Sequence, residues 1–340
     1  MNRQPTRIIV IKSGWHTTVQ DLGRYGYQQY GVPVSGAMDA FSTIVANRLV
    51  GNPDDAAVLE LTLKGPELQF EQDTAVAITG ADLSPTVNGN NVPMWQSILI
   101  PRNSQLSFRM ARTGSRAYLA VSGGIEVPLV LGSRSTHCAS ETGGYAGRQV
   151  KPGDVLRSGK PGAIVSRLIG SRLLDELIPR YKRSATLRII PGPQQNFFSE
   201  KSFGALTTAT YTVSAESNRM GYRLTGPKIV RKGSSQFISD GTAMGELQVP
   251  PDGKPILLMA DRQTTGGYPK IAVVISADLP LAAQLAPGDT ISFAPCTVAQ
   301  SQTALRQHRT QLDAALPPHQ LSPPQPRTHS TTDPSSSIRK

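Results

Sequence analysis

The sequence predicts a mostly β fold built from two similar domains in tandem. Its 340 residues include 31 glycines and 27 prolines, a composition typical of many short strands joined by turns. A Gly-Pro turn at 65–66 and a Pro-Gly-Asp turn at 152–154 recur in the same order at 226–227 and 287–289. Because the order is kept, the second half is expected to repeat the first. The length also fits two domains of about 150 residues each.

The first domain is expected over residues 6–160. A strand at 7–12 precedes a polar and aromatic loop at 14–27, which fits neither a helical nor an alternating period. Further short strands are expected at 58–63, 68–70, 75–79, 97–100, 105–109 and 117–121, separated by Gly- and Asn-rich turns. The turn at 152–154 and the strand after it would close the domain.

A helix is expected from Asp39 to the glycine at 51, with apolar residues spaced along one face. Asp39 is a good N-cap, so capping is its first interpretation. Because a helix N-terminus also attracts anions, the lead-in at 35–38 could instead hold a phosphate or a carboxylate.

Residues 161–185 are expected to form a partly helical linker, because they are charged and rich in leucine. The second domain is expected over 186–298, with strands at 187–190, 209–214, 236–239, 245–250, 255–260, 271–275 and 288–293. A short helix at 278–286 would be capped by Asp278 and ended by Pro287. Residues 299–340 are rich in Pro, Ser, Gln, Thr and His, which predicts a disordered tail.

Charge and cysteine content exclude several classes of protein. The net charge is +11, but five of the basic residues lie in the tail and the rest are scattered, so nucleic acid is not an expected partner. An excess of positive charge suits a small anionic ligand or an acidic partner. Cys138 and Cys296 show no metal-ligand spacing, so no metal site is expected. The absence of a signal sequence and of an 18-residue apolar run predicts a cytoplasmic protein outside the membrane.

The stretch at 261–270, Asp-Arg-Gln-Thr-Thr-Gly-Gly-Tyr-Pro-Lys, is the first candidate for chemistry. It joins two apolar strands with a long polar turn, and binding groups are often mounted on such turns. The alternative is a plain hairpin loop, in which the glycines supply positive φ and Asp261 accepts from backbone amides.

Similar clusters of carboxylate or amide, arginine, hydroxyl and glycine occur at 20–24, 133–135 and 217–222. Arginines bind carboxylates or phosphates through two hydrogen bonds, amides stabilise an oxyanion, and a desolvated aspartate accepts a proton. Structural alternatives stay open: an Asp21–Arg24 ion pair, a turn capped by Asn218, and tyrosines at the rim of the core. The sequence contains no phosphate-binding loop, dinucleotide fingerprint, nucleophile elbow or biotin attachment site.

Together these motifs resemble one family, the biotin-dependent carboxyltransferases, also called allophanate hydrolase subunit 2. The family includes the C subunit of bacterial 5-oxoprolinase, the regulator KipA and half of the carboxyltransferase domain of urea carboxylase. The resemblance runs from about residue 8 to 293, and the 42-residue tail departs from it. The motifs are, in chain order, Val-Gln-Asp-Leu-Gly-Arg at 19–24, Ser-Gly-Ala-Met-Asp at 35–39, Ala-Asn at 46–47, Gly-Asn at 51–52, Leu-Gly-Ser-Arg-Ser-Thr at 131–136, Ser-Asn-Arg-Met-Gly-Tyr-Arg-Leu at 217–224, Gln-Val-Pro at 248–250 and the stretch at 261–269.

The resemblance implies two cyclophilin-like β-barrel domains and a sister B subunit, similar to allophanate hydrolase subunit 1, together with an A subunit. Family members take part in the ATP-dependent opening of 5-oxoproline to glutamate, and this is the first hypothesis. In the second, the chain moves a carboxyl group from carboxybiotin, carried by another chain, to urea or another amide. The third is a non-enzymatic, KipA-like regulator.

Candidate residues are chosen for their chemistry within these motifs. The expected catalytic residues are Asp261, Asn218 and Asp39. The expected substrate-binding residues are Arg24, Arg134, Arg219, Tyr222, Thr264, Thr265, Gly266, Gly267 and Tyr268. We expect the loops of both domains to converge on one pocket that holds a small anionic substrate.

Overall fold

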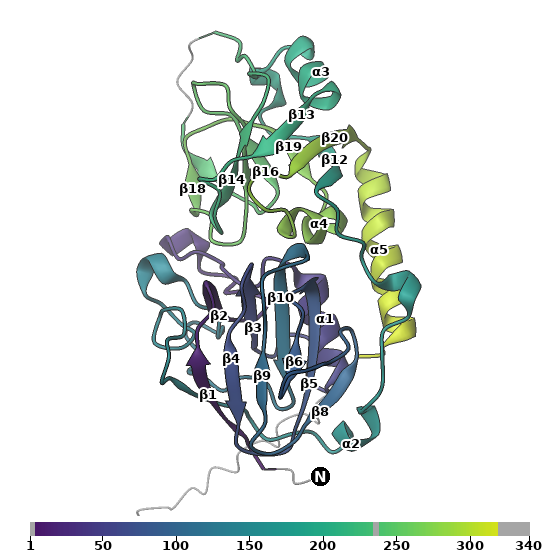
Figure 1. The fold of residues 1–340 in the computed structure, drawn as a ribbon. Helices are drawn as coiled ribbons and strands as arrows, with labels where there is room; N and C mark the ends of the chain where they lie inside the picture. The colour runs from purple at the N-terminus through teal and green to yellow at the C-terminus, as the bar shows by residue number, and fades with distance from the viewer. Residues whose placement is uncertain (1–3, 234–237, 319–340) are drawn as a thin grey trace, which may run out of the picture.

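A computed structural model describes residues 4–233 and 238–318 of the chain. It is mostly β with a few helices, as predicted, and its two domains are stacked end to end (Figure 1). In the described residues no helix is long and apolar enough to cross a membrane.

The first domain consists of two antiparallel sheets. The six-stranded sheet has the order β11 (Val155–Arg157), β1 (Arg7–Lys12), β4 (Glu67–Phe70), β9 (Gln105–Ser107), β6 (Thr86–Val87), β7 (Asn90–Asn91). The five-stranded sheet has the order β2 (His16–Gln20), β3 (Val58–Thr62), β10 (Thr113–Val121), β5 (Thr74–Asp82), β8 (Ser97–Ile100). Both sheets contribute side chains to one apolar core.

Helix α1 (Ala40–Leu49) covers the other face of the five-stranded sheet, so strand β3 is buried on both sides. Leu59 and Leu61 point into the core of the first domain, whereas Val58 lies in the cluster around α1. Because side chains alternate along a strand, Glu60 faces the same side as Val58. This alternation places a carboxylate that is 0 % exposed beside the N-terminus of α1.

The second domain is a closed barrel with the strand order β12 (Ser184–Pro191), β19 (Lys270–Val274), β16 (Glu246–Gln248), β17 (Ile256–Leu258), β14 (Gly221–Thr225), β13 (Thr210–Val213), β20 (Thr290–Pro295). The parallel pairing of β12 with β20 closes it. Helices α3 (Glu200–Thr208) and α4 (Leu279–Ala283) pack against it, and β15 (Asp240–Gly241) pairs with β18 (Thr265–Gly266).

The two Pro-Gly-Asp turns adopt the same geometry. Asp154 accepts a hydrogen bond from the Lys151 amide at 2.7 Å, and Asp289 accepts one from the Ala286 amide at 2.9 Å. The intervening glycines both have a φ of 90°, which disfavours any other residue. Each turn leads into the last strand of its domain, β11 or β20.

The stretch at 261–270 is not a hairpin loop. Strands β17 and β19 both pair with β16, which lies between them. The stretch therefore crosses one end of the barrel instead of joining neighbouring strands, and this brings Asp261 to the boundary with the first domain.

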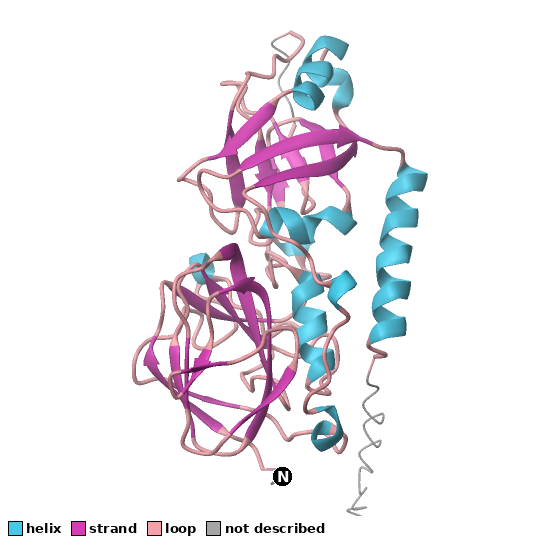
Figure 2. Cartoon of the chain, turned by 45° about the vertical axis from the view of Figure 1, so that its right-hand side comes forward, coloured by secondary structure: helices cyan, strands magenta, loops and turns pink. Residues whose placement is uncertain are grey.

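The expected disorder from residue 299 is wrong for the described part of the tail. Helix α5 (Val298–Ala315) begins with a capping box between Thr297 and Gln300 and runs alongside both domains (Figure 2). Ala304 packs with residues of the second domain, and Leu312 packs in the cluster around α1. Residues 319–340 lie outside the described ranges.

Two smaller expectations also need correction. Asp278 makes no side-chain cap at α4 and instead accepts hydrogen bonds from the amide and guanidinium of Arg188 at 2.6–3.0 Å. The strand expected at 236–239 is not formed at 238–239, and 236–237 lie outside the described residues. The linker contains α2 (Val165–Leu168) and a short 3-10 turn at Asp175–Leu177.

Candidate functional site

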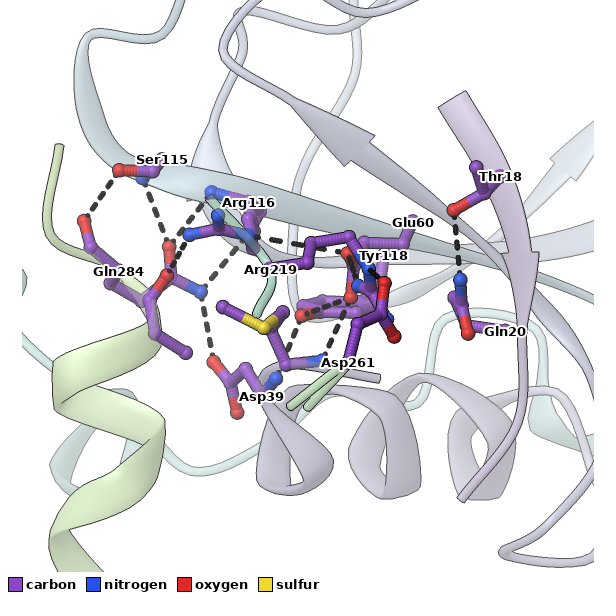
Figure 3. A network of polar contacts seen from close by, with 12 residues as sticks. Thr18, Gln20, Asp39, Glu60, Ser115, Arg116, Tyr118, Arg219, Asp261 and Gln284 are labelled. Atoms are coloured by element: carbon purple, nitrogen blue, oxygen red, sulfur yellow. Dashed lines mark hydrogen bonds and ion pairs between the residues drawn. The ribbon is translucent and has the colours of Figure 1, made fainter. Parts of the chain in front are cut away.

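An ion pair between Arg219 and Asp261 belongs to a network of polar contacts at the domain boundary (Figure 3). Arg219 donates from Nε to Asp261 Oδ2 at 2.8 Å and from Nη2 to Oδ1 at 3.0 Å. The Asp261 amide also donates to the Arg219 carbonyl at 2.8 Å. The two segments that contain these residues therefore do meet, while the pocket expected between the loops stays a prediction. Their side chains are about one-tenth exposed, at 11 % and 10 %.

Arg219 also binds the first domain. Its Nη2 donates to the Gly36 carbonyl at 2.6 Å, and its Nη1 forms a short ion pair with Glu60. Glu60 in turn accepts from the Met38 amide at 2.8 Å and from the Tyr118 hydroxyl at 2.9 Å. One guanidinium thus links a carboxylate of each domain.

Gln284 of the second domain makes a second polar connection to the first. Its Oε1 accepts from the amides of Ser115 and Arg116, both at 3.0 Å. Its Nε2 donates to Asp39 Oδ2 at 2.8 Å and to the Arg116 carbonyl at 2.9 Å. The Arg116 guanidinium donates to the Tyr222 hydroxyl at 2.7 Å and lies 4.0 Å from Glu60. These directional bonds fix how the domains face each other.

The loop after β2 brings a third arginine to the site. Asp21 organises this loop by accepting from the Gly23 amide at 2.8 Å, the Ser133 hydroxyl at 2.7 Å and the Ser135 hydroxyl. Arg24 donates from Nε to the Val130 carbonyl at 2.8 Å and from Nη2 to the Ser135 carbonyl at 2.9 Å. The two guanidinium bonds of Arg24 thus go to carbonyls, and the expected alternative of an Asp21–Arg24 ion pair is not what holds this loop.

Arg24 is 1 % exposed, and no described residue accepts a hydrogen bond from its Nη1. Burial lowers the pKa of this guanidinium, although the nearby charges of Asp21 and Asp261 oppose the shift. A buried guanidinium with a free donor is costly unless another group completes its hydrogen bonds. This donor is therefore the clearest candidate for contact with an anionic ligand.

The charge of Asp261 is stabilised by its surroundings. Burial alone would raise the pKa of this carboxyl, but the charge and hydrogen bonds of Arg219 outweigh it and hold the pKa below its ordinary value. The Ser35 hydroxyl beside it acts in the same direction. Asp261 is consequently an ionised and well-oriented carboxylate, and it is a weak proton acceptor at neutral pH.

Two histidines lie within the electrostatic reach of this pair. Burial lowers the pKa of His137, and the positive charge of Arg219 adds to the shift. Burial also lowers the pKa of His16, again with a contribution from Arg219. Both imidazoles are therefore neutral at pH 7. The Nδ1 of His137 is 2.6 Å from the Ser140 hydroxyl.

The remainder of the stretch at 261–270 forms the outer part of the site. Thr265, Gly267 and Tyr268 are exposed, and Thr264 is half-buried. Gly266 is buried, and a Cβ at this position would lie 2.3 Å from Gln248 Nε2. The exposed members remain available to a ligand.

Four candidate residues have structural partners instead. Asn218 is exposed and caps its own turn by accepting from the Met220 amide at 2.8 Å. Tyr222 is 1 % exposed and is held by Arg116, which leaves it no accessible surface for a substrate. Asp39 caps α1 by accepting from the Ser42 amide at 2.9 Å, and burial raises the pKa of its carboxyl. Arg134 donates from Nε to the Val127 carbonyl at 3.1 Å and lines a separate hollow of about 420 Å³.

The lead-in to α1 does not offer free amides at 38 and 39 to an anion. Met38 donates to Glu60, and Asp39 donates to the Tyr118 hydroxyl at 2.8 Å. Among the described residues, no group of three or more His, Cys, Asp or Glu side chains is placed to hold a metal ion.

Sequence reasoning did not select Glu60, Arg116, Tyr118, Gln284 or His137. Glu60 had one local signal in the sequence, a carboxylate in the middle of the strand expected at 58–63. Arg116 and Gln284 carry no local signal, because their roles arise from contacts between the two domains. Tyr118 and His137 have contacts within the first domain, with Glu60 and Ser140 respectively.

Residues 30–295 match the family described as the carboxyltransferase domain, subdomain A and B. The chain is similar to the C subunit of 5-oxoprolinase from Escherichia coli (strain K12), with 39 % identity over 297 residues that cover 87 % of this chain and 93 % of that protein. It is 34 % identical over 306 residues to the C subunit of 5-oxoprolinase from Haemophilus influenzae, covering 90 % and 96 % of the two chains. The crystal structure of the Kluyveromyces lactis urea amidolyase superimposes with a TM-score of 0.85 at 32 % identity, over 95 % of this chain and 20 % of that one.

Proposed function

Because the chain belongs to the carboxyltransferase domain family, subdomain A and B, we propose that it is the C subunit of an ATP-dependent 5-oxoprolinase complex. The complex would open the lactam of 5-oxo-L-proline to L-glutamate together with its sister A and B subunits, in the cytoplasm. Two relatives that share nearly their full length with this chain carry the name of that C subunit.

The free donor of Arg24 is the observation that carries the proposal. The substrate, 5-oxoproline, is a small carboxylate, and a guanidinium binds a carboxylate with strong charge-assisted hydrogen bonds. In this assignment the substrate carboxylate completes the hydrogen bonds of Arg24 Nη1. Because Nη1 is buried, the groups that cover it must move aside as the substrate enters.

Arg219 and Asp261 form the wall against which the lactam lies. The fixed carboxylate of Asp261 orients the lactam N–H by accepting a hydrogen bond from it, and Arg219 holds Asp261 in position. In this assignment His137, which is neutral and has its Nδ1 beside the Ser140 hydroxyl, accepts the proton of the attacking water through Nε2 and passes it to the lactam nitrogen as the C–N bond breaks. The exposed residues Thr265 and Tyr268 form the entrance.

The nucleotide does not fit this part of the molecule. ATP supplies the free energy for lactam opening, but the triphosphate needs several free cationic donors. At the site Arg219 is already bonded to two carboxylates and a carbonyl, and Arg24 keeps one free nitrogen. We therefore assign no phosphate contact to these residues.

The test is to reconstitute the complex from this chain and the two other subunits, and to measure glutamate formed from 5-oxoproline and ATP. Asp261→Asn and Arg24→Lys should each lower kcat/KM by more than tenfold, since each removes a directional charged contact. Arg102→Ala, at an exposed position away from the site, should match the wild type. A well-folded complex with no turnover would overturn the proposal.

A second function is favoured by the likeness to urea amidolyase. Here the same residues would bind urea or another amide and receive a carboxyl group from carboxybiotin carried by another chain. A gene for a biotin carboxylase or a biotin carrier beside this one would favour this second function. Carboxylation of urea by the reconstituted proteins, without turnover of 5-oxoproline, would establish it.

A further inference from the structure

The hollow lined by Arg134 takes no part in the proposed function. Its volume is about 420 Å³, and small-molecule sites commonly measure about 300–1,000 Å³. Besides Arg134, three chain segments form its walls: residues 51–57 after α1, residues 123–126 after β10 and residues 159–162 after β11. We call it the Arg134 hollow. It is large enough for one small molecule, and its lining shares no residue with the Arg219–Asp261 network.

Four charged side chains surround the Arg134 hollow, and none of them forms an ion pair with another described residue. They are the cations Arg134 and Lys160 and the anions Asp55 and Glu126. Arg134 donates from Nε to the Val127 carbonyl at 3.1 Å, so its two Nη nitrogens have no described acceptor. The other three side chains are exposed and make no hydrogen bond in the described part of the chain. The hollow thus keeps opposite charges apart, and all four remain available to a ligand that lies between them.

One wall of the hollow suits a cationic group. Gly51 directly follows the C-cap of α1, and the C-terminal end of a helix dipole is negative. No described group donates a hydrogen bond to the Gly51 carbonyl. Asp55 lies in the same segment and adds a full negative charge. A ligand ammonium group would therefore be stabilised here by a carboxylate, a free carbonyl and the helix end.

Much of the lining is backbone, which leaves room for a ligand. Five glycines contribute to it: Gly51, Gly123, Gly124, Gly159 and Gly162. A Cβ added at Gly162 would meet only the Gly51 carbonyl oxygen, at 3.6 Å, which is ordinary contact. Ala56, Ala57 and Ile125 add apolar surface on which methylene groups can pack.

We propose that the Arg134 hollow binds an acidic α-amino acid, with its two carboxylates on Arg134 and Lys160 and its ammonium group on Asp55, Glu126 and the Gly51 carbonyl. The charges of such a ligand match those of the hollow, because each carboxylate meets a cation and the ammonium group meets the acceptors. A plain dicarboxylate would leave both anions without a partner, and a neutral amino acid would leave one cation without a partner. Binding here does not depend on the proposed function.

Binding can be measured on the full chain by isothermal titration calorimetry. L-glutamate should give a saturable heat. Glutarate lacks the ammonium group and 4-aminobutyrate lacks the α-carboxylate, so each should bind at least about tenfold more weakly, from the loss of a charge-assisted contact.

Two kinds of variant locate the site. Arg134→Gln and Lys160→Gln remove one cation each, and each should weaken L-glutamate binding by roughly tenfold. Gly162→Leu changes no charge but places a side chain in the hollow, so it should abolish binding. Gly204→Leu is the matched control, because Gly204 is exposed on α3, has open space around an added Cβ and lines no part of the hollow. It should bind like the parent, and thermal unfolding verifies that each variant is folded.

The proposal fails if L-glutamate gives no saturable heat, if glutarate binds as tightly as L-glutamate, or if folded Gly162→Leu binds as tightly as Gly204→Leu. L-glutamate is also the product of the proposed reaction, so binding at the candidate site must be told apart. Binding that is lost in Arg24→Lys and kept in Gly162→Leu belongs to the candidate site and overturns the Arg134 hollow. Absence of turnover in the reconstituted wild-type complex overturns the proposed function, while the titration of the chain alone still decides the hollow.

Discussion

Replacing Arg219 by glutamine should be the most destabilising single substitution at the domain boundary. Arg219 neutralises two carboxylates, Glu60 at 0 % and Asp261 at 10 % side-chain exposure, and also donates to the Gly36 carbonyl. Removing one partner of a buried ion pair leaves an uncompensated charge and costs about 3–5 kcal/mol. Glu60 keeps the Met38 amide and the Tyr118 hydroxyl, so most of the cost falls on Asp261.

The assay is urea unfolding at neutral pH and low salt, with Arg223→Gln as the matched control. Arg223 lies four residues further along the chain, on β14. It pairs with Glu216 at 3.5 Å, but both side chains are more than half exposed. Its loss should cost about 0–1 kcal/mol. The double variant Arg219→Gln/Asp261→Asn should be less destabilised than the sum of the single variants, because neutralising Asp261 removes the unpaired charge. Strictly additive effects, or equal losses for the two arginines, would refute the reasoning.

Three further predictions concern the tail, the pH dependence and the loop beside Arg24. Leu312→Ala should cost about 2–5 kcal/mol in urea unfolding because Leu312 is 6 % exposed, whereas Leu305→Ala, at 48 % exposure, should cost less than about 0.5 kcal/mol. Folding lowers the pKa of His137 from its ordinary value of 6.5, so the unfolded chain binds more protons than the folded chain below that pH. The free energy of unfolding should therefore fall as the pH drops from 6.5. His137→Asn should reduce this pH dependence when unfolding is measured across the same range. Gly143→Ala would place a Cβ 2.2 Å from a backbone oxygen, and it should lower the melting temperature more than Gly132→Ala, which has similar positive φ but open space.

Local chemistry was sufficient to predict several parts of the molecule. Asp39 was expected to cap α1, and it does so through the Ser42 amide. The meeting of the segments that contain Arg219 and Asp261 was also expected, because each combines a charged group with glycines that permit close approach. The turn chemistry at 152–154 and 287–289 predicted two equivalent turns, because proline and glycine at these positions restrict the backbone directly.

Other parts depend on contacts that no local pattern records. Gln284 looks like an ordinary helix-end residue in the sequence, and its four hydrogen bonds exist only once the two domains have docked. Helix α5 was missed because its composition is polar and its buried residues, Ala304 and Leu312, are about two turns apart. Its capping box, Thr297 with Gln300, was the available signal, since this pair satisfies amides at the start of a helix.

The polar character of the domain boundary explains how one site can be assembled from two domains. The first domain supplies Arg24 and Glu60, and the second supplies Arg219 and Asp261, so neither domain carries the full set. An apolar boundary of the same size would tolerate sliding, because hydrophobic contact is not directional. Hydrogen-bonded charges tolerate little displacement, since a shift of about one ångström leaves buried groups unpaired. The two domains are therefore held in the orientation that places Arg24 within the electrostatic reach of Asp261, and α5, which packs on both, supports that orientation from the outside.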